Sequence, residues 1–191
     1  MRPFAQIIWE NRHKLDKGND CLITCDGTDF RIPEHGKRFY SHKFKKSALR
    51  YEVCLCILTG DIVWSNGPYE AGKYPDISIF RGSLMTELSP NERVEADDGY
   101  IGEHPRHIKC PGGFANLPET EFMQQRIRNR QETINKRFKD WGALRQTWRH
   151  EIVRHAEAFA VIVIVCQLSI NEGEKLFDCG YRDPPYIDED L

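Results

Sequence analysis

The stretch from residue 21 to residue 32 constrains the fold more than any other part of the chain. It is an apolar, β-prone run with one carboxylate, Asp26, in its middle and Gly27 directly after it. Read as a strand, it places Thr24 and Asp26 on one face and Cys25 on the other. A carboxylate on a mostly buried strand is costly unless it is paired or bound to a metal. Asp26 is therefore either a structural oddity or the first residue of a site.

Two further strands are expected after this one. Residues 49–58 and 62–65 are apolar runs, and residues 59–61 between them have the chemistry of a hairpin turn. The basic and aromatic segment 34–46 reads as a loop between strands. Together these runs predict a three-stranded antiparallel meander whose first strand carries Asp26.

The rest of the chain predicts shorter strands and then long helices. The expected elements are a helix over 4–17, a turn-rich loop over 67–76, a short helix over 77–80, short strands over 93–97 and 108–111, long helices over 118–141 and 150–171, and a small strand over 176–182. The helix over 150–171 is almost entirely apolar, so we expect it to be buried. We predict one α/β domain over residues 1–183 and a disordered acidic tail over 184–191.

Charge and cysteine content narrow the class of protein. The net charge is −2, but the helical region 126–149 is strongly basic, and a local basic patch indicates a polyanionic partner. Seven cysteines without a Cys-x-x-Cys pair indicate reduced, intracellular thiols that act as small apolar side chains, with a zinc site as the alternative. No signal peptide is visible, and the apolar run 156–168 is too short to span a bilayer. A soluble protein is expected.

Four carboxylates are candidates for one site: Asp26 on the first strand, Asp76 at a helix start, Asp97 at the end of a strand, and Glu132 on the long helix. A site with two divalent cations needs several carboxylates from different elements, and Mg²⁺ prefers such oxygen ligands. Strand ends and helix faces around one sheet edge can bring these groups together. The spacing alone does not prove that they do.

Each of the later acids also has a simpler interpretation. Asp76 precedes an apolar helical run and suits an N-cap. Asp97 and Asp98 stand before a glycine and suit a turn. Glu132 lies off the apolar stripe of its helix, where it can be a solvated partner of Lys136.

Several ordered motifs resemble the DDE superfamily endonuclease domain of Harbinger-type transposases and their domesticated relatives. The matching segments are Cys-Asp-Gly-Thr at 25–28, Gly-Pro-Tyr through Asp-Ile-Ser-Ile-Phe at 67–80, Ala-Asp-Asp-Gly-Tyr at 96–100, and the acid-bearing helix with its Lys-x-Phe-like motif at 130–139. They occur in the family's order and cover most of the chain.

The resemblance implies an RNase H-like fold and a nuclease that cuts DNA phosphodiester bonds with Mg²⁺ or Mn²⁺. By position, the catalytic acids are Asp26, Asp97 and Glu132, and Asp76 is a further metal-site carboxylate. The motif selects Asp97 over Asp98, which remains the alternative. Gly27 is expected to leave room for the metal or a phosphate.

The resemblance also implies partners and a location. DNA is the expected partner, the expected location is the nucleus, and relatives work with a Myb-like DNA-binding protein. Their N-terminal helix-turn-helix region has no counterpart in the short segment before residue 21. The open alternatives are a catalytically inactive, domesticated remnant that binds DNA or protein, and an unrelated metal-dependent phosphohydrolase.

Basic side chains near the expected site are candidates for DNA contact. Arg128, Lys136 and Lys139 share the helix of the last acid, and Lys43 and Lys45 belong to the basic loop. Such contacts hold the phosphate backbone without reading its sequence. The alternative for each group is an ordinary solvated surface.

Overall fold

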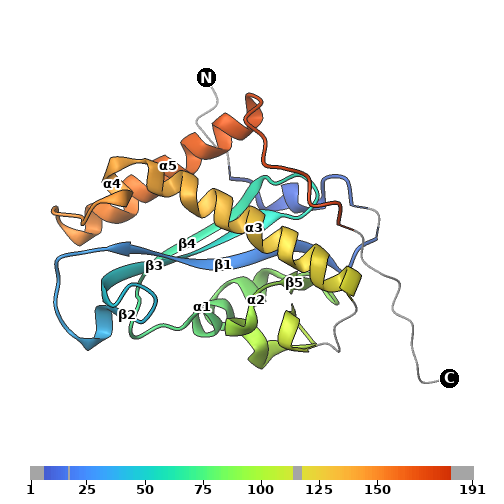
Figure 1. The fold of residues 1–191 in the computed structure, drawn as a ribbon, viewed down its shortest axis with the longest axis horizontal. Helices are drawn as coiled ribbons and strands as arrows, with labels where there is room; N and C mark the ends of the chain where they lie inside the picture. Colours follow the sequence, from blue (N-terminus) through green and yellow to red (C-terminus); the bar gives the residue numbers. More distant parts are fainter. Residues whose placement is uncertain (1–6, 17, 114–117, 182–191) are drawn as a thin grey trace.

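Six strands form one mixed sheet with helices on both faces (Figure 1). The computed structural model describes residues 7–16, 18–113 and 118–181. The strands are β1 (Cys21–Arg31), β2 (Tyr40–Ser41), β3 (Lys46–Cys56), β4 (Ile62–Glu70), β5 (Arg93–Glu95) and β6 (Ile108–Lys109). The helices are α1 (Asp76–Gly82), α2 (Leu84–Glu87), α3 (Pro118–Asp140), α4 (Gly142–Arg145) and α5 (Ile152–Asn171). Short 3-10 helices are η1 (Trp9–His13), η2 (Lys37–Phe39), η3 (Asp98–Glu103) and η4 (Pro111–Gly113).

Strand β1 lies inside the sheet and has a partner on each side. On one side it pairs with β3 in antiparallel register, and β3 in turn pairs with β4 and with the two-residue β2. On the other side β5 runs parallel to β1 and pairs only with its first residues, 21–24, and β6 runs parallel to β5. The predicted α/β class, with three antiparallel strands followed by shorter ones, is confirmed.

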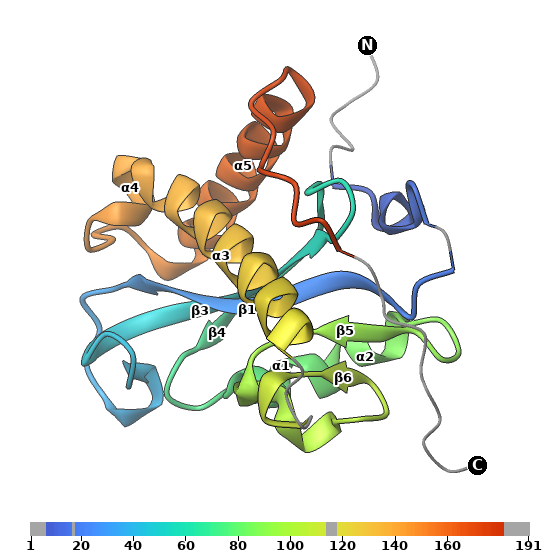
Figure 2. The ribbon, with the colours of Figure 1, turned by 45° about the vertical axis from the view of Figure 1, so that its right-hand side comes forward.

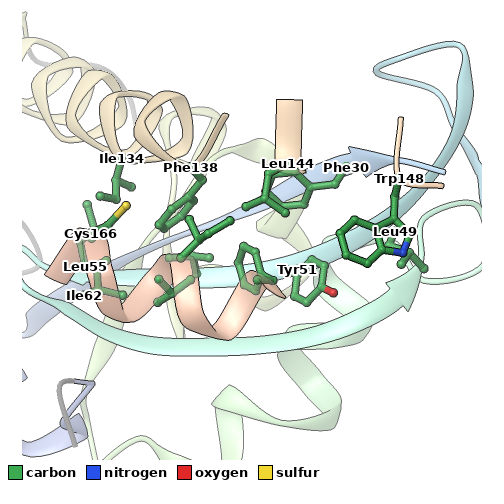
Figure 3. Packing of buried hydrophobic residues seen from close by; sticks show 14 of the residues in the cluster. Phe30, Leu49, Tyr51, Leu55, Ile62, Ile134, Phe138, Leu144, Trp148 and Cys166 are labelled. Carbon is green, nitrogen blue, oxygen red and sulfur yellow. The ribbon is translucent and has the colours of Figure 1, made fainter. Parts of the chain in front are cut away.

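The helices form two layers around this sheet. In both views α3 and α5 lie over one face, and α1 and α2 lie over the other (Figures 1 and 2). Alternation of side chains along β3 and the second half of β1 supplies an apolar surface to each layer. Phe30 and Tyr51 pack on Phe159 of α5, while Cys25 and Cys54 pack with Phe80 of α1 (Figure 3 shows the α5 side).

All seven cysteines are buried thiols. Cys25, Cys54, Cys56 and Cys110 lie together in the core beneath α1 and α2, where they pack against aliphatic and aromatic side chains. Their surroundings agree with the interpretation of cysteine as a small apolar residue.

Two segments that were predicted as loops contain regular secondary structure. Residues 67–70, predicted as loop, are the second half of β4, because an irregularity in the ladder between Arg50 and Glu52 lets the strand continue past a glycine and a proline. The segment 34–46 is not a plain loop: it contains η2 and β2.

Predictions at the two ends of the chain also need correction. In the predicted helix 4–17 the described residues contain only η1, and residues 1–6 and 17 lie outside the described part. Residues 176–181 form no strand, because their backbone is held by arginine side chains of α3 rather than by a neighbouring strand. The predicted tail 184–191 lies outside the described residues.

Helix α5 is buried on one face only. Its inner face packs on the sheet and on α3, whereas Val153 and Val161 on the outer face are 67% and 59% exposed. By length and composition α5 could cross a membrane, contrary to the expectation from the shorter run 156–168. Its place against the sheet is that of a core helix, and core helices meet the same two criteria.

His155 is a buried histidine whose neutral form the fold requires. It is 1% exposed, its Nδ1 lies 2.8 Å from the Tyr51 hydroxyl oxygen, and burial lowers its pKa from 6.5 to about 4. Between these two pKa values the unfolded chain binds a proton that the folded chain does not. The contribution of His155 to the free energy of unfolding should therefore decrease as the pH falls from about 7 towards 4, whereas the raised pKa of Asp26 acts in the opposite direction.

We expect the substitution His155→Gln to remove part of this decrease, because glutamine does not titrate. Urea unfolding at about pH 7.5 and about pH 5 measures the change in the free energy of unfolding. The control is His13→Gln, at an exposed histidine, which should keep the wild-type pH dependence. Equal pH dependence in both variants and the wild type would contradict the assignment to His155.

Candidate active site

A pocket of about 390 Å³ lies between β1, the end of β5 and α3. Asp26 reaches it from β1, Asp97 from the turn after β5, and Glu132 from α3. The complete lining is Thr24, Cys25, Asp26, Lys43, Ala96, Asp97, Arg128, Gln131, Glu132, Asn135, Lys136 and Lys139. The three acids predicted to be catalytic therefore line one pocket, although they are far apart in the sequence.

Asp26 lies at the inner wall of this pocket, on the face of β1 that α3 covers. Asn135 of α3 donates a hydrogen bond from Nδ2 to its Oδ2 at 2.8 Å. Burial raises the pKa of Asp26 to about 6; the charge of Lys43 opposes this rise, and those of Asp97 and Asp76 add to it. Negative charges gathered around a buried carboxylate in this way make a cation favourable at the same place.

Asp97 has a structural role as well as a place in the pocket. Its side chain caps η3 by accepting a hydrogen bond from the Gly99 amide at 2.9 Å. Its neighbour Asp98 accepts from the Gly112 amide at 2.7 Å and does not line the pocket. The turn-forming interpretation thus holds for both residues, and only Asp97 also faces the other acids.

Asp76 is not among the residues that line this pocket. It is the first residue of α1 rather than its N-cap, which is Pro75, and no side-chain hydrogen bond caps the helix. Its Oδ1 lies 3.3 Å from Nη1 of Arg50. The same guanidinium donates to both carboxylate oxygens of Asp29, at 2.7 and 3.0 Å. Asp76 therefore joins α1 to the sheet through Arg50.

Gly27 provides the space that Asp76 occupies. A Cβ atom at position 27 would overlap the Asp76 carboxylate. The absence of a side chain thus serves the packing of α1 on β1, whereas the sequence suggested room for a metal or a phosphate. Burial also raises the pKa of Asp76, and the charge of Arg50 opposes that rise.

Glu132 is exposed and projects from α3 at the outer wall of the pocket. Lys136 lines the same pocket, but the described contacts include no ion pair between the two. Glu132 is therefore a surface residue, but the predicted ion pair with Lys136 does not form among the described residues.

Two amide side chains complete the wall formed by α3, and the sequence analysis missed both. Gln131 and Asn135 are buried, and Gln131 Nε2 donates to the Val53 carbonyl at 3.0 Å. Within the part of the chain that the structure describes, Gln131 Oε1 and Asn135 Oδ1 have no hydrogen-bond donor. The available signal was the spacing of Gln131 and Asn135, because residues four apart share a helix edge, and Asn135 is also three residues after Glu132.

These oxygens suit a hard divalent cation only in part. Carboxylate and amide oxygens without donors are the ligands that Mg²⁺ and Mn²⁺ accept. However, within residues 7–16, 18–113 and 118–181 no group of three or more His, Cys, Asp or Glu side chains lies close enough to hold a metal ion. The pocket thus offers suitable donor atoms but not a closed shell of carboxylates.

Four of the five predicted DNA-contacting residues line the same pocket: Lys43, Arg128, Lys136 and Lys139. Burial and the charge of Lys43 lower the pKa of Lys139. Lys45, the fifth, lies outside and lines a separate surface hollow. The pocket therefore combines three acids with cations from α3 and from the segment between β1 and β3.

The remaining arginines of α3 serve the fold. Arg126, Arg130 and Arg137 donate to backbone carbonyls of the C-terminal segment, those of Asp178, Phe177 and Glu174. Only part of the basic character of this helix therefore faces the pocket.

Comparison of the chain with protein-family models, curated proteins and solved structures finds no match. The resemblance to DDE endonuclease domains stays a prediction from the sequence motifs.

The contact between Gly27 and Asp76 predicts a coupled pair of substitutions. Gly27→Ala should destabilise the fold by about 1–3 kcal/mol, because the new methyl group displaces the Asp76 carboxylate. In an Asp76→Ala background the same change should cost much less. Urea unfolding of the four proteins in this cycle measures the coupling.

A glycine in open space provides the control for this cycle. A Cβ atom at Gly82, in α1, meets no atom within 4 Å, so Gly82→Ala should be neutral or slightly stabilising. A fully additive cycle between positions 27 and 76 would show that the contact has no energetic weight.

Proposed function

We propose that this chain is a divalent-metal-dependent nuclease domain that cleaves DNA phosphodiester bonds. One observation carries the proposal. Asp26, Asp97 and Glu132, taken from three separate sequence motifs, line a single pocket together with four basic side chains. The carboxylates can bind a metal ion that contacts the phosphate to be cleaved. The surrounding cations can hold the neighbouring phosphates of the polynucleotide.

The arrangement of the sheet supports the same proposal. Three antiparallel strands, then shorter strands, then long helices are the order expected of the RNase H-like fold of DDE endonucleases. We propose that fold for this chain. In it, the central strand β1 carries the first acid and α3 the last.

The residues of the pocket divide into two groups by role. Asp26, Asp97 and Glu132 would hold Mg²⁺ or Mn²⁺, and the buried oxygens of Gln131 and Asn135 lie beside them. A bound ion would polarise the phosphate and lower the pKa of an attacking water. Asp76, whose carboxylate lies against Gly27, would add negative charge near the metal ion rather than bind it directly.

The other group positions the substrate. Lys43, Arg128, Lys136 and Lys139 present cations around the acids, where phosphate oxygens of a polynucleotide can contact them. Asn135 holds one oxygen of Asp26 through its amide nitrogen and so orients this carboxylate in the pocket. DNA, a Myb-like partner protein and a nuclear location belong to this proposal.

The second candidate function is a catalytically inactive remnant that binds DNA or protein. It is favoured by the lack, in the described part of the chain, of three acids close enough to hold one ion. Isothermal titration with Mn²⁺ separates the two functions. Uptake that disappears in Asp26→Asn supports the nuclease, and no uptake by the wild type supports the remnant.

Substitution of the pocket acids tests the proposal directly. Asp26→Asn, Asp97→Asn and Glu132→Gln should each lower the rate of DNA nicking by about 100-fold or more, because each removes a ligand charge. Chelation of the metal should abolish nicking in the wild type. Nicking is followed by relaxation of supercoiled plasmid in Mn²⁺ or Mg²⁺.

Asp98→Asn is the matched control, because Asp98 adjoins Asp97 in the sequence but faces away from the pocket. It should keep the wild-type rate, and circular dichroism should show that all four variants are folded. An unchanged rate in folded Asp26→Asn would refute the catalytic assignment.

A further inference from the structure

The segment between β1 and β3 carries an excess of positive charge. We call residues 32–47, with η2 and β2, the basic hairpin. Its single acid is Glu34, and Arg38 forms an ion pair with Glu70 at 3.4 Å. Its four lysines, Lys37, Lys43, Lys45 and Lys46, are exposed, and none forms an ion pair in the described part of the chain. Exposed cations this close repel one another and favour a polyanion.

The basic hairpin is nevertheless firmly attached to the sheet. Ser41 Oγ donates to Asp29 at 2.6 Å and accepts from the Phe44 amide at 3.2 Å. The Gly72 amide donates to the Arg38 carbonyl at 2.9 Å, and Phe39 is buried in the core. These contacts hold the lysines in place before any partner binds, which lowers the entropy cost of binding.

The basic hairpin continues directly from the candidate active site. Lys43 lines the pocket of the acids. The next residue, Phe44, has the Arg31 guanidinium 5.5 Å and the Lys139 ammonium 5.1 Å from its ring centroid. Lys139 lines the same pocket. A continuous band of positive charge therefore leads from the acids onto the hairpin.

Beyond Phe44 the basic hairpin has a hollow of its own, of about 450 Å³. Lys37, Lys45 and Lys46 line it, and Glu34 is its one carboxylate. Tyr40 lies at the same hollow and is 38% exposed. The His42 ring packs edge-on against the Tyr40 ring at a centroid distance of 5.3 Å. Exposed aromatic rings among lysines are typical of proteins that bind single-stranded nucleic acid, whose bases stack on the rings.

We propose that the basic hairpin binds an unpaired stretch of the polynucleotide substrate, with phosphates on Lys37, Lys45 and Lys46 and a base stacked on Tyr40. This proposal rests on the proposed function, because it takes the same DNA strand to run on into the pocket. A paired duplex fits less well, since its bases are stacked within the helix and do not present a face to a protein ring.

Binding without cleavage tests the proposal. Fluorescence anisotropy in EDTA would follow a labelled thymidine oligonucleotide, either single-stranded or paired with its complement. Tyr40→Ala should weaken single-strand binding by about tenfold, and Tyr40→Phe should retain it, because only the ring is needed. Phe177→Ala, which removes an aromatic ring of similar exposure (41%) elsewhere on the surface, should have no effect.

The salt dependence tests the lysines separately. The double variant Lys45→Ala, Lys46→Ala should reduce the slope of log affinity against log salt by about 1.4, or about 0.7 for each lost phosphate contact. Lys175→Ala, an exposed lysine in the hollow near residues 58–61 at the opposite end of β3, should leave the slope unchanged. Equal affinity of Tyr40→Ala and the wild type, or stronger wild-type binding to the duplex, would overturn the proposal.

Failure of this proposal can be told apart from failure of the proposed function. If single-strand binding depends on Tyr40 but no DNA is nicked in Mn²⁺, the hairpin site stands and the nuclease proposal falls. If DNA is nicked through Asp26 while Tyr40→Ala binds like the wild type, the nuclease stands and the hairpin site falls.

Discussion

The ion pairs between Arg50 and two aspartates hold together three elements, β1, β3 and α1, on which the rest of the architecture depends. Arg50 of β3 binds Asp29 of β1 through two hydrogen bonds and Asp76 of α1 through a third contact. Removing one member of a buried or half-buried group of charges leaves the others unpaired and destabilises the fold. The three side chains are therefore expected to act as a unit. Its position next to Gly27 fixes where α1 meets the sheet. It also ties Asp76 to the packing of α1 on the sheet, and the acids that line the pocket are those of β1, the turn after β5, and α3.

Helix α3 divides its polar residues between two tasks. One edge donates arginine hydrogen bonds to the backbone of residues 174–178, and another presents Arg128, Glu132 and Lys136 to the pocket. Phe138 and Ile134 pack on the core between these edges. The helix is thus anchored from two sides, which holds its pocket-facing residues at a fixed distance from β1. A high count of basic residues in a helix does not by itself measure the charge that faces a ligand.

Much of the fold follows from patterns in the sequence, and the exceptions have physical causes. Apolar, β-prone runs were sufficient to predict the presence of β1 and β3, and helical periodicity was sufficient for α3 and α5. Residues 67–70 were predicted as loop because glycine and proline usually end strands, whereas an irregular ladder tolerates them in β4. The order of the motifs predicted Asp26, Asp97 and Glu132 as site residues, and these three residues line one pocket. The role of Asp76 was not predictable, because it depends on Arg50, which is distant in the sequence.

The difference in length between neighbouring strands determines where the pocket can form. Strand β1 has eleven residues and β5 has three, so β5 accompanies β1 only as far as Thr24. From Asp26 onwards, that edge of β1 has no strand beside it among the described residues, and the pocket opens at this point. The entrance is therefore a missing piece of sheet rather than a groove between helices. Its width depends on where β5 stops, and a longer β5 would draw Ala96 and Asp97 of the lining into the sheet.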